Sequence, residues 1–95
     1  MDKQTLEELV ETKEKHTYDQ IFVETFSISP EQLGDSIAYN QFLAWDSIGH
    51  MTLIAALESA FGITMDTDDI LNFSSYKKGF EILSKYGVQV DKKAA

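Results

Sequence analysis

The chain has 95 residues, no cysteine and a formal net charge of −8, from 16 aspartates and glutamates against 8 lysines. A chain of this length forms one domain with a modest core and little room for a separate catalytic cleft, which argues against an enzyme. The absence of cysteine excludes disulfides and thiolate metal sites, and no apolar run approaches the roughly 20 residues of a membrane span.

Negative charge is concentrated in the middle of the chain. Between Ser27 and Leu71 there are seven acids and no lysine. Such a surface repels nucleic acid, whose binding depends on cations, and attracts basic protein partners. The alternative, that the acids only keep the chain soluble, stays open. Because the N-terminus begins with charged residues and no basic region leads into an apolar run, we expect a cytoplasmic protein.

Helical spacing begins near the N-terminus. Apolar residues recur three and four positions apart from Thr5 to Phe26, but the pattern weakens between Glu11 and Thr17. We therefore expect residues 1–16 to be a helical extension separate from the domain that follows.

A capped turn and a long loop come next. Ser29, followed by a proline and then by Gln32, is typical of a reciprocally capped short helix. Residues 34–45 have no period but carry several large apolar side chains, including Phe42 and Trp45. We expect this loop to be held against the core, with Trp45 as its main clamp.

The clearest helix opens at Ser47 and runs from about Ile48 to Phe61, where Gly62 can adopt the left-handed conformation that ends a helix. The apolar positions expected in the core are Leu53, Ile54 and Leu57.

Two more helical segments complete the pattern. Asp66 caps a short segment that ends at Asn72, in which Ile70 and Leu71 are expected to point inward. The last helix lies between Ser74 and Gly87, with a buried stripe of Tyr76, Phe80 and Leu83 flanked by Ile82. The chain is therefore predicted to be an all-α bundle of three main helices, one short third helix and a long first loop.

A family resemblance follows from the motif around the main helix. Trp45-Asp46-Ser47-Ile48-Gly49-His50-Met51, with a Phe-Gly-Ile exit at residues 61–63, resembles the Asp-Ser-Leu attachment motif and second helix of the acyl carrier protein family. The resemblance covers about residues 17–86, which we take as an acyl carrier domain with a four-helix bundle. Residues 87–95 are then a C-terminal tail.

The resemblance implies a function for two residues. Ser47 would receive 4′-phosphopantetheine from coenzyme A through a phosphopantetheinyl transferase, and Asp46 would be recognised by that transferase. The arm would carry acyl groups as thioesters to acyl-loading, condensing or acyl-transferring enzymes. The chemistry of the position agrees, because unpaired amides and the positive end of a helix accommodate a phosphate ester at Ser47. No metal, nucleic acid or membrane is implied, and we expect a monomer.

Partner docking is predicted on the second and third helices of the bundle. The residues expected to contribute are Ile48, Met51, Glu58, Asp68, Asp69 and Ile70. The second helix is less acidic than in fatty-acid carriers, a feature that resembles carriers of specialised polyketide, peptide or polysaccharide-linked pathways.

Other functions are compatible with parts of the sequence. The chain could be a peptidyl or aminoacyl carrier of a nonribosomal pathway, or a carrier fold without the arm. A Ser47–His50 hydrolase is disfavoured because Trp45 stands where a Gly-x-Ser-x-Gly elbow needs glycine. His50 is then expected to be a partner-facing or a surface residue. A calcium loop starting at Asp66 fails because Leu71 stands where its glycine is needed.

Overall fold

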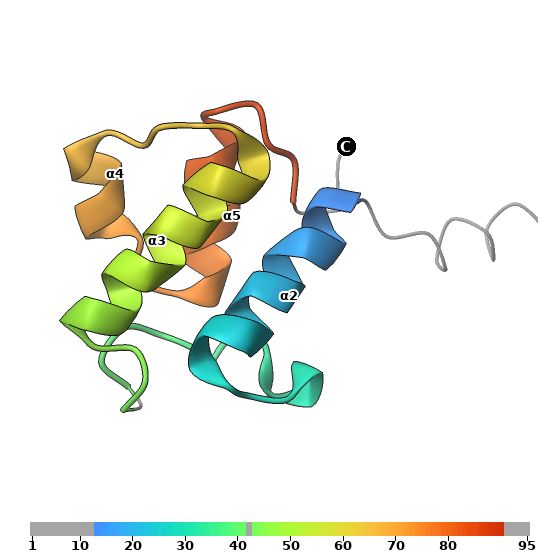
Figure 1. Cartoon of the computed structure of the whole chain (residues 1–95), viewed down its shortest axis with the longest axis vertical. Helices are drawn as coiled ribbons and strands as arrows, with labels where there is room; N and C mark the ends of the chain where they lie inside the picture. Colours follow the sequence, from blue (N-terminus) through green and yellow to red (C-terminus); the bar gives the residue numbers. More distant parts are fainter. Residues whose placement is uncertain (1–12, 42, 91–95) are drawn as a thin grey trace, which may run out of the picture.

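The computed structural model describes residues 13–41 and 43–90, and the regular elements in these ranges are all helical. They are α2 (Lys13–Phe26), the 3₁₀ helix η1 (Pro30–Gln32), α3 (Ser47–Phe61), α4 (Thr67–Asn72) and α5 (Tyr76–Ser84) (Figure 1). The prediction of an all-α bundle with three main helices and a short one before the last is confirmed.

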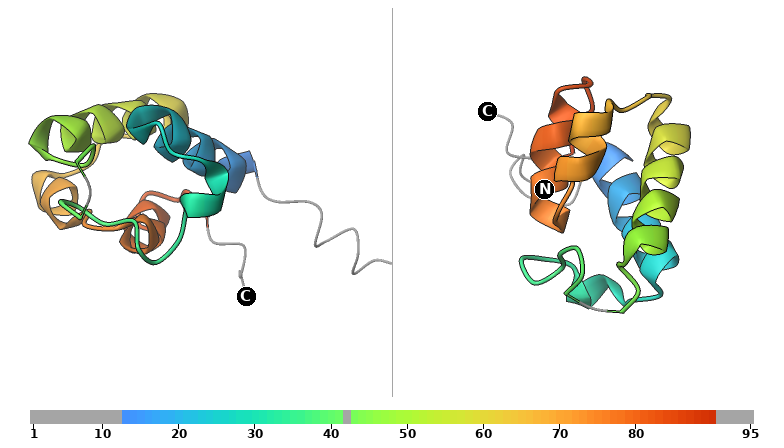
Figure 2. Two further views of the ribbon diagram at one scale, coloured as in Figure 1. Left: turned by 90° about the horizontal axis from the view of Figure 1, so that it is seen from below. Right: turned by 90° about the vertical axis from the view of Figure 1, so that its left-hand side faces the viewer.

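Aromatic side chains of α2 and α5 meet in the centre of the core. Tyr18 and Phe22 are fully buried, and the ring of each lies 5.3 Å from that of Tyr76. The Tyr18 hydroxyl donates a hydrogen bond of 2.6 Å to the Tyr76 carbonyl, so this phenol is buried without losing its partner. Figure 2 shows the helices surrounding this core. The predicted core residues of α3 are confirmed as buried: Leu53, Ile54 and Leu57.

The loop between η1 and α3 is bonded to the junction of α4 and α5. The Tyr39 amide donates to the Ser74 carbonyl and the Tyr76 amide donates to the Ile37 carbonyl, both at 2.9 Å. These bonds flank an isolated antiparallel bridge between Ala38 and Ser75. The loop therefore has a defined path across one end of the bundle, as Figure 2 also shows.

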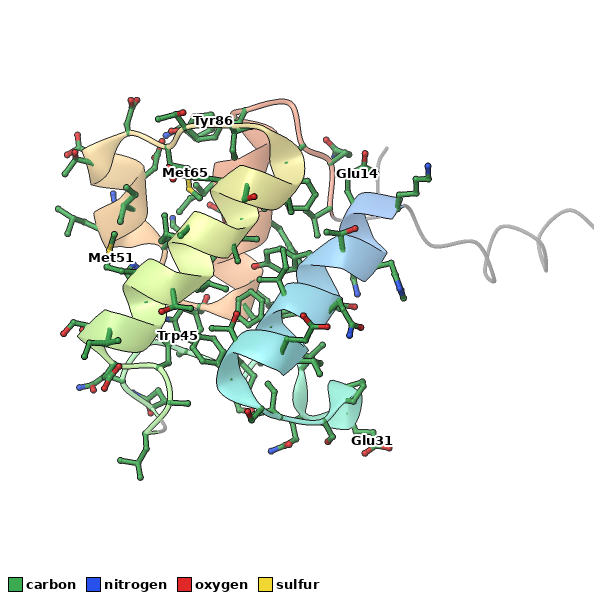
Figure 3. The ribbon with its side chains drawn as sticks, viewed as in Figure 1. Glu14, Glu31, Trp45, Met51, Met65 and Tyr86 are labelled. Carbon is green, nitrogen blue, oxygen red and sulfur yellow. The ribbon has the colours of Figure 1, made fainter. Side chains whose placement is uncertain are left out.

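Trp45 attaches the same loop to the core. Its side chain is 0% exposed, and its ring is stacked on Phe26 at 5.1 Å and meets Phe22 edge-on at 5.5 Å. Figure 3 shows Trp45 between α3 and α2. The predicted clamp is confirmed. Phe42, whose apolar side chain also suggested a held loop, lies outside the described residues.

Two predicted helix ends are present. The Ser29 amide donates to Oε1 of Gln32 at 2.9 Å, which completes the reciprocal cap of η1. Gly62 follows α3 with φ 66°, ψ 38°, and its amide bonds to the Glu58 carbonyl. Glycine suits this position because it adopts the left-handed conformation without the steric cost that a Cβ would bring.

The buried faces of the last two helices differ from the prediction. Leu71 is 73% exposed, because consecutive helical residues point about 100° apart and it is Ile70 that packs, partly buried, against the core. Ile82 is buried while Phe80 is only half-buried. Core side chains pack closely against α5 at Gly79, where an added Cβ would come within 2.4 Å of the Phe73 ring. The buried face of α5 is therefore centred on Gly79 together with Ile82 and Leu83.

The domain limits stay predictions. Helix α2 begins at Lys13, before the predicted domain start, and residues 1–12 lie outside the described residues. At the other end Val88 and Val90 belong to the buried core cluster although they follow the predicted limit at residue 86.

Candidate functional site

Ser47 is the first residue of α3, and its side chain is exposed. Asp46 forms the N-cap: its Oδ1 accepts the Gly49 amide and its carbonyl accepts the His50 amide, both at 2.8 Å. The amides of Ser47 and Ile48 precede these at the open end of the helix. A serine hydroxyl is therefore presented to solvent at the positive end of a 15-residue helix, where an attached phosphate is stabilised.

Close packing of the preceding loop holds the first turn of α3. A Cβ added at Gly49 would lie 2.0 Å from the Ala44 carbonyl oxygen and 3.3 Å from Cε1 of Phe26. The helix can approach the loop backbone this closely only because position 49 has no side chain. Gly49 therefore allows the loop to pack against the first turn of α3, the turn that begins at Ser47.

His50 is part-buried within this arrangement. Its Nδ1 accepts a hydrogen bond of 2.9 Å from Trp45 Nε1, and its Nε2 lies 2.8 Å from the Ile70 carbonyl oxygen. The ring also stacks on Trp45, with 18° between the two planes. Both ring nitrogens are therefore bonded within the fold, and the prediction that His50 lies on the surface or faces partners stays a prediction.

A largely apolar groove of about 310 Å³ opens beside Ser47. Met51 of α3 forms one side, and Figure 3 shows its side chain directed toward α4. Ile70 and Leu71 form the opposite side, and Tyr39 of the loop contributes as well. A group attached to Ser47 therefore has an apolar surface within reach.

Large apolar side chains are exposed around the same serine. Ile48 is 78% and Met51 53% exposed, and they are neighbours on one face of α3 since they are three residues apart. Leu71 of α4 adds to this surface. Leu43, which the sequence reasoning did not select, is 95% exposed and shares a shallow hollow with Asp46. Exposed apolar groups gathered at one place are typical of an interaction surface.

The three acids predicted for docking differ in availability. Asp68 is exposed, whereas Glu58 is half-buried and its Oε2 accepts the Met65 amide at 2.9 Å. Asp69 is only 5% exposed, and its two oxygens accept hydrogen bonds of 2.6 Å from Lys85 and Tyr86. These bonds, that from Lys85 first, hold the pKa of Asp69 below its usual value. The position of Asp69 does not support the docking role predicted for it.

Comparison with known families identifies the domain. A family model described as a phosphopantetheine attachment site matches residues 19–78, which include all of α3 and α4. The chain belongs to this family of phosphopantetheine-binding carriers. Searches among curated proteins and among solved structures found no match.

A phosphopantetheine-binding carrier holds 4′-phosphopantetheine as its prosthetic group and works with partner enzymes, including the transferase that attaches the group. The described residues fit this group, since they present a hydroxyl at the positive end of a helix beside an apolar groove. Within residues 13–41 and 43–90, no cluster of three or more potential ligand side chains could hold a metal ion. None of the helices described is both long and apolar enough to cross a membrane.

Proposed function

We propose that Ser47 is the attachment residue and that the chain carries acyl groups between enzymes of a fatty-acid, polyketide or related specialised pathway. The exposed Ser47 hydroxyl at the first position of α3 supports this proposal most directly. The attached group supplies a terminal thiol that binds acyl groups as thioesters, and the chain itself has no cysteine. On this proposal the chain carries the acyl group, and the enzymes that load and unload it perform the chemistry.

Asp46 prepares the site for the transferase. Its carboxylate caps α3 through the Gly49 amide and keeps the first turn, and with it Ser47, in one orientation. The side chain remains exposed beside the serine. We propose that the transferase recognises this carboxylate together with the hydroxyl.

Docking of partner enzymes is proposed on the face that surrounds Ser47. Ile48, Met51 and Leu71 supply its apolar centre, since all three are more than half exposed. Asp68 supplies an exposed negative charge at its edge. Ile70 lies deeper, as part of the groove wall, and Glu58 and Asp69 are left out because their carboxylates are bonded within the fold. Partners would then bring an apolar patch with nearby cations.

Intact mass spectrometry tests the attachment site. The chain is incubated with coenzyme A and a transferase of broad specificity, and the mass should increase by one phosphopantetheine group. Ser47→Ala should abolish the increase. Ser59→Ala is the matched control, because Ser59 is also exposed on α3 and its loss should leave the modification intact.

Two results would count against the proposal. An increase that persists in Ser47→Ala would move the attachment to another residue. No increase in the wild-type chain, with a known carrier modified in the same reaction, would favour a carrier fold that acts without the arm.

A further inference from the structure

The groove beside Ser47 has an exposed rim and a buried inner side. Ser47, Met51 and Leu71, which line it, are all exposed to solvent. The part-buried His50 and the fully buried Phe73 line it as well. The groove therefore opens over α3 and α4 and ends inward on these two rings.

The ring of His50 crosses the space between the start of α3 and helix α4. Its Nδ1 accepts a hydrogen bond of 2.9 Å from Trp45 Nε1, and its Nε2 lies 2.8 Å from the Ile70 carbonyl oxygen. An indole N–H can only donate and a carbonyl oxygen can only accept, so the ring accepts on one side and donates on the other. His50 thus forms a polar bridge across the inner side of the groove.

The core begins directly behind this bridge. The His50 ring stacks on Trp45 and meets Phe73 edge-on, at centroid distances of 6.1 and 6.4 Å, and both partners are fully buried. Leu53 and Ile54, three and four positions along α3 and therefore on the same face, are 0% and 1% exposed. An alkyl chain that passed from the groove between α3 and α4 would have to displace the ring to reach them.

Displacing the ring would cost hydrogen bonds in the interior. The buried Trp45 N–H would lose its bond to the ring, and so would the Ile70 carbonyl. A polar group that loses its partner away from water keeps the full cost of desolvation. The loss of both bonds therefore offsets the burial of several methylene groups. An acyl group of only a few carbons gains less in the core than the bridge loses.

We propose that His50 is a specificity-determining residue that keeps the acyl cargo in the outer groove and out of the bundle core. A cargo held there has one side toward solvent and toward partner enzymes. This arrangement suits short acyl groups and acyl groups with polar substituents, since a long alkyl chain would forgo the burial that favours it. The consequence for cargo rests on Ser47 being the attachment residue, whereas the closed route is a property of the unmodified chain.

An alkyl chain attached at position 47 tests the closed route without a transferase. Because the chain has no cysteine, Ser47→Cys provides a single thiol for a hexyl thiosulfonate reagent. Nuclear Overhauser contacts of the hexyl group should reach Met51 and Leu71 and should not reach Leu53 or Ile54. Contacts with either of the last two, with His50 in place, would overturn the proposal even if no further variant folds.

Two further substitutions in the Ser47→Cys chain make the test specific. His50→Ala removes the ring and both bonds, so the hexyl contacts should extend to Leu53 and Ile54. Met51→Ala is the matched control, because it enlarges the groove and leaves the bridge in place. A folded His50→Ala variant without core contacts, or core contacts in Met51→Ala equal to those in His50→Ala, would show that the bridge does not close the route.

The wild-type chain loaded with a hexanoyl-phosphopantetheine group extends the test to the cargo itself. Its hexanoyl group should also stay away from Leu53 and Ile54. Contacts with these residues would contradict the proposal for cargo on the arm. Failure of loading, seen in the intact mass, would count against Ser47 as the attachment residue, and the result on the Ser47→Cys conjugate would still decide whether the route is closed.

Discussion

Gly49 determines how closely the loop can approach the attachment helix, and its replacement gives a sharp test. Alanine favours a helix over glycine by about 1 kcal/mol. Gly49→Ala should nevertheless destabilise the domain by about 1–3 kcal/mol, because the new Cβ would meet the Ala44 carbonyl oxygen at 2.0 Å and the backbone must shift. The midpoint of urea unfolding measures the effect.

Ser59→Ala serves as control on the same helix, since it is exposed and should change the free energy of unfolding by no more than about 0.5 kcal/mol. A Gly49→Ala variant as stable as the wild type would show that the loop and α3 are not in the described contact.

Residues near the site also show where sequence reasoning succeeds and fails. The helix start at Ser47 was predicted correctly because the residues that cap and begin a helix are visible in the local sequence. The burial of Trp45 was predicted correctly because so large an aromatic side chain gains much from burial. The bonds of His50 within the fold were not predicted, although it precedes the buried Leu53, Ile54 and Leu57 by three, four and seven positions, the spacing of one helix face. That spacing could have indicated that the His50 ring lies partly toward the core. Its bond to the Ile70 carbonyl could not be predicted, because it depends on where α4 packs.

Helix α4 depends on bonds to the residues that follow α5. Lys85 and Tyr86 both donate to Asp69, and the Tyr86 hydroxyl accepts the Asp66 amide at 2.8 Å. Because these bonds lower the pKa of Asp69 in the folded state, the ionised carboxylate stabilises the fold above its unfolded pKa of about 3.9. That stability should be lost as the pH falls through the lower folded value.

Asp69→Asn should therefore be less stable than the wild type near neutral pH, and the difference should shrink below about pH 4. Thermal unfolding across this pH range provides the measurement. Asp68→Asn is the matched control, because Asp68 is the neighbouring residue on α4 and its carboxylate is exposed. Equal pH dependence of Asp69→Asn and wild type would contradict the role given to Asp69.

The short helix also shows the limit of periodicity. A segment of six residues is less than two turns, so its pattern could not decide which of Ile70 and Leu71 faces inward. The longer α3 repeats its apolar spacing over 15 residues, and its core side was predicted correctly.

The charge of the whole molecule should affect how fast it is modified. With a net charge of −8, the chain should attract a transferase with a basic docking face, and salt should weaken that attraction. The kcat/KM for modification of Ser47 should fall severalfold when ionic strength rises from about 0.05 to about 0.5 M. Asp68→Asn should reduce this dependence.

Glu31→Gln is the control, since it removes the same charge from η1, which Figure 3 shows away from Met51 and the docking face. An equal effect of the two substitutions would mean that total charge, and not the docking face, governs the encounter.

The overall architecture was predictable as a bundle because capping residues and apolar spacing mark most of its helices. The order in which the helices pack was not. The hydrogen bonds of the Tyr39 and Tyr76 amides, which fix the loop against the junction of α4 and α5, join backbone groups. Backbone groups are the same at nearly every residue, so the sequence does not reveal which of them will pair.

Trp45 is the only tryptophan in the chain, and it is buried directly beneath the start of α3. The domain consequently carries an intrinsic optical probe next to its functional serine. The emission spectrum of this indole would register loading, docking or loosening at that end of the bundle in real time, without any dye or label.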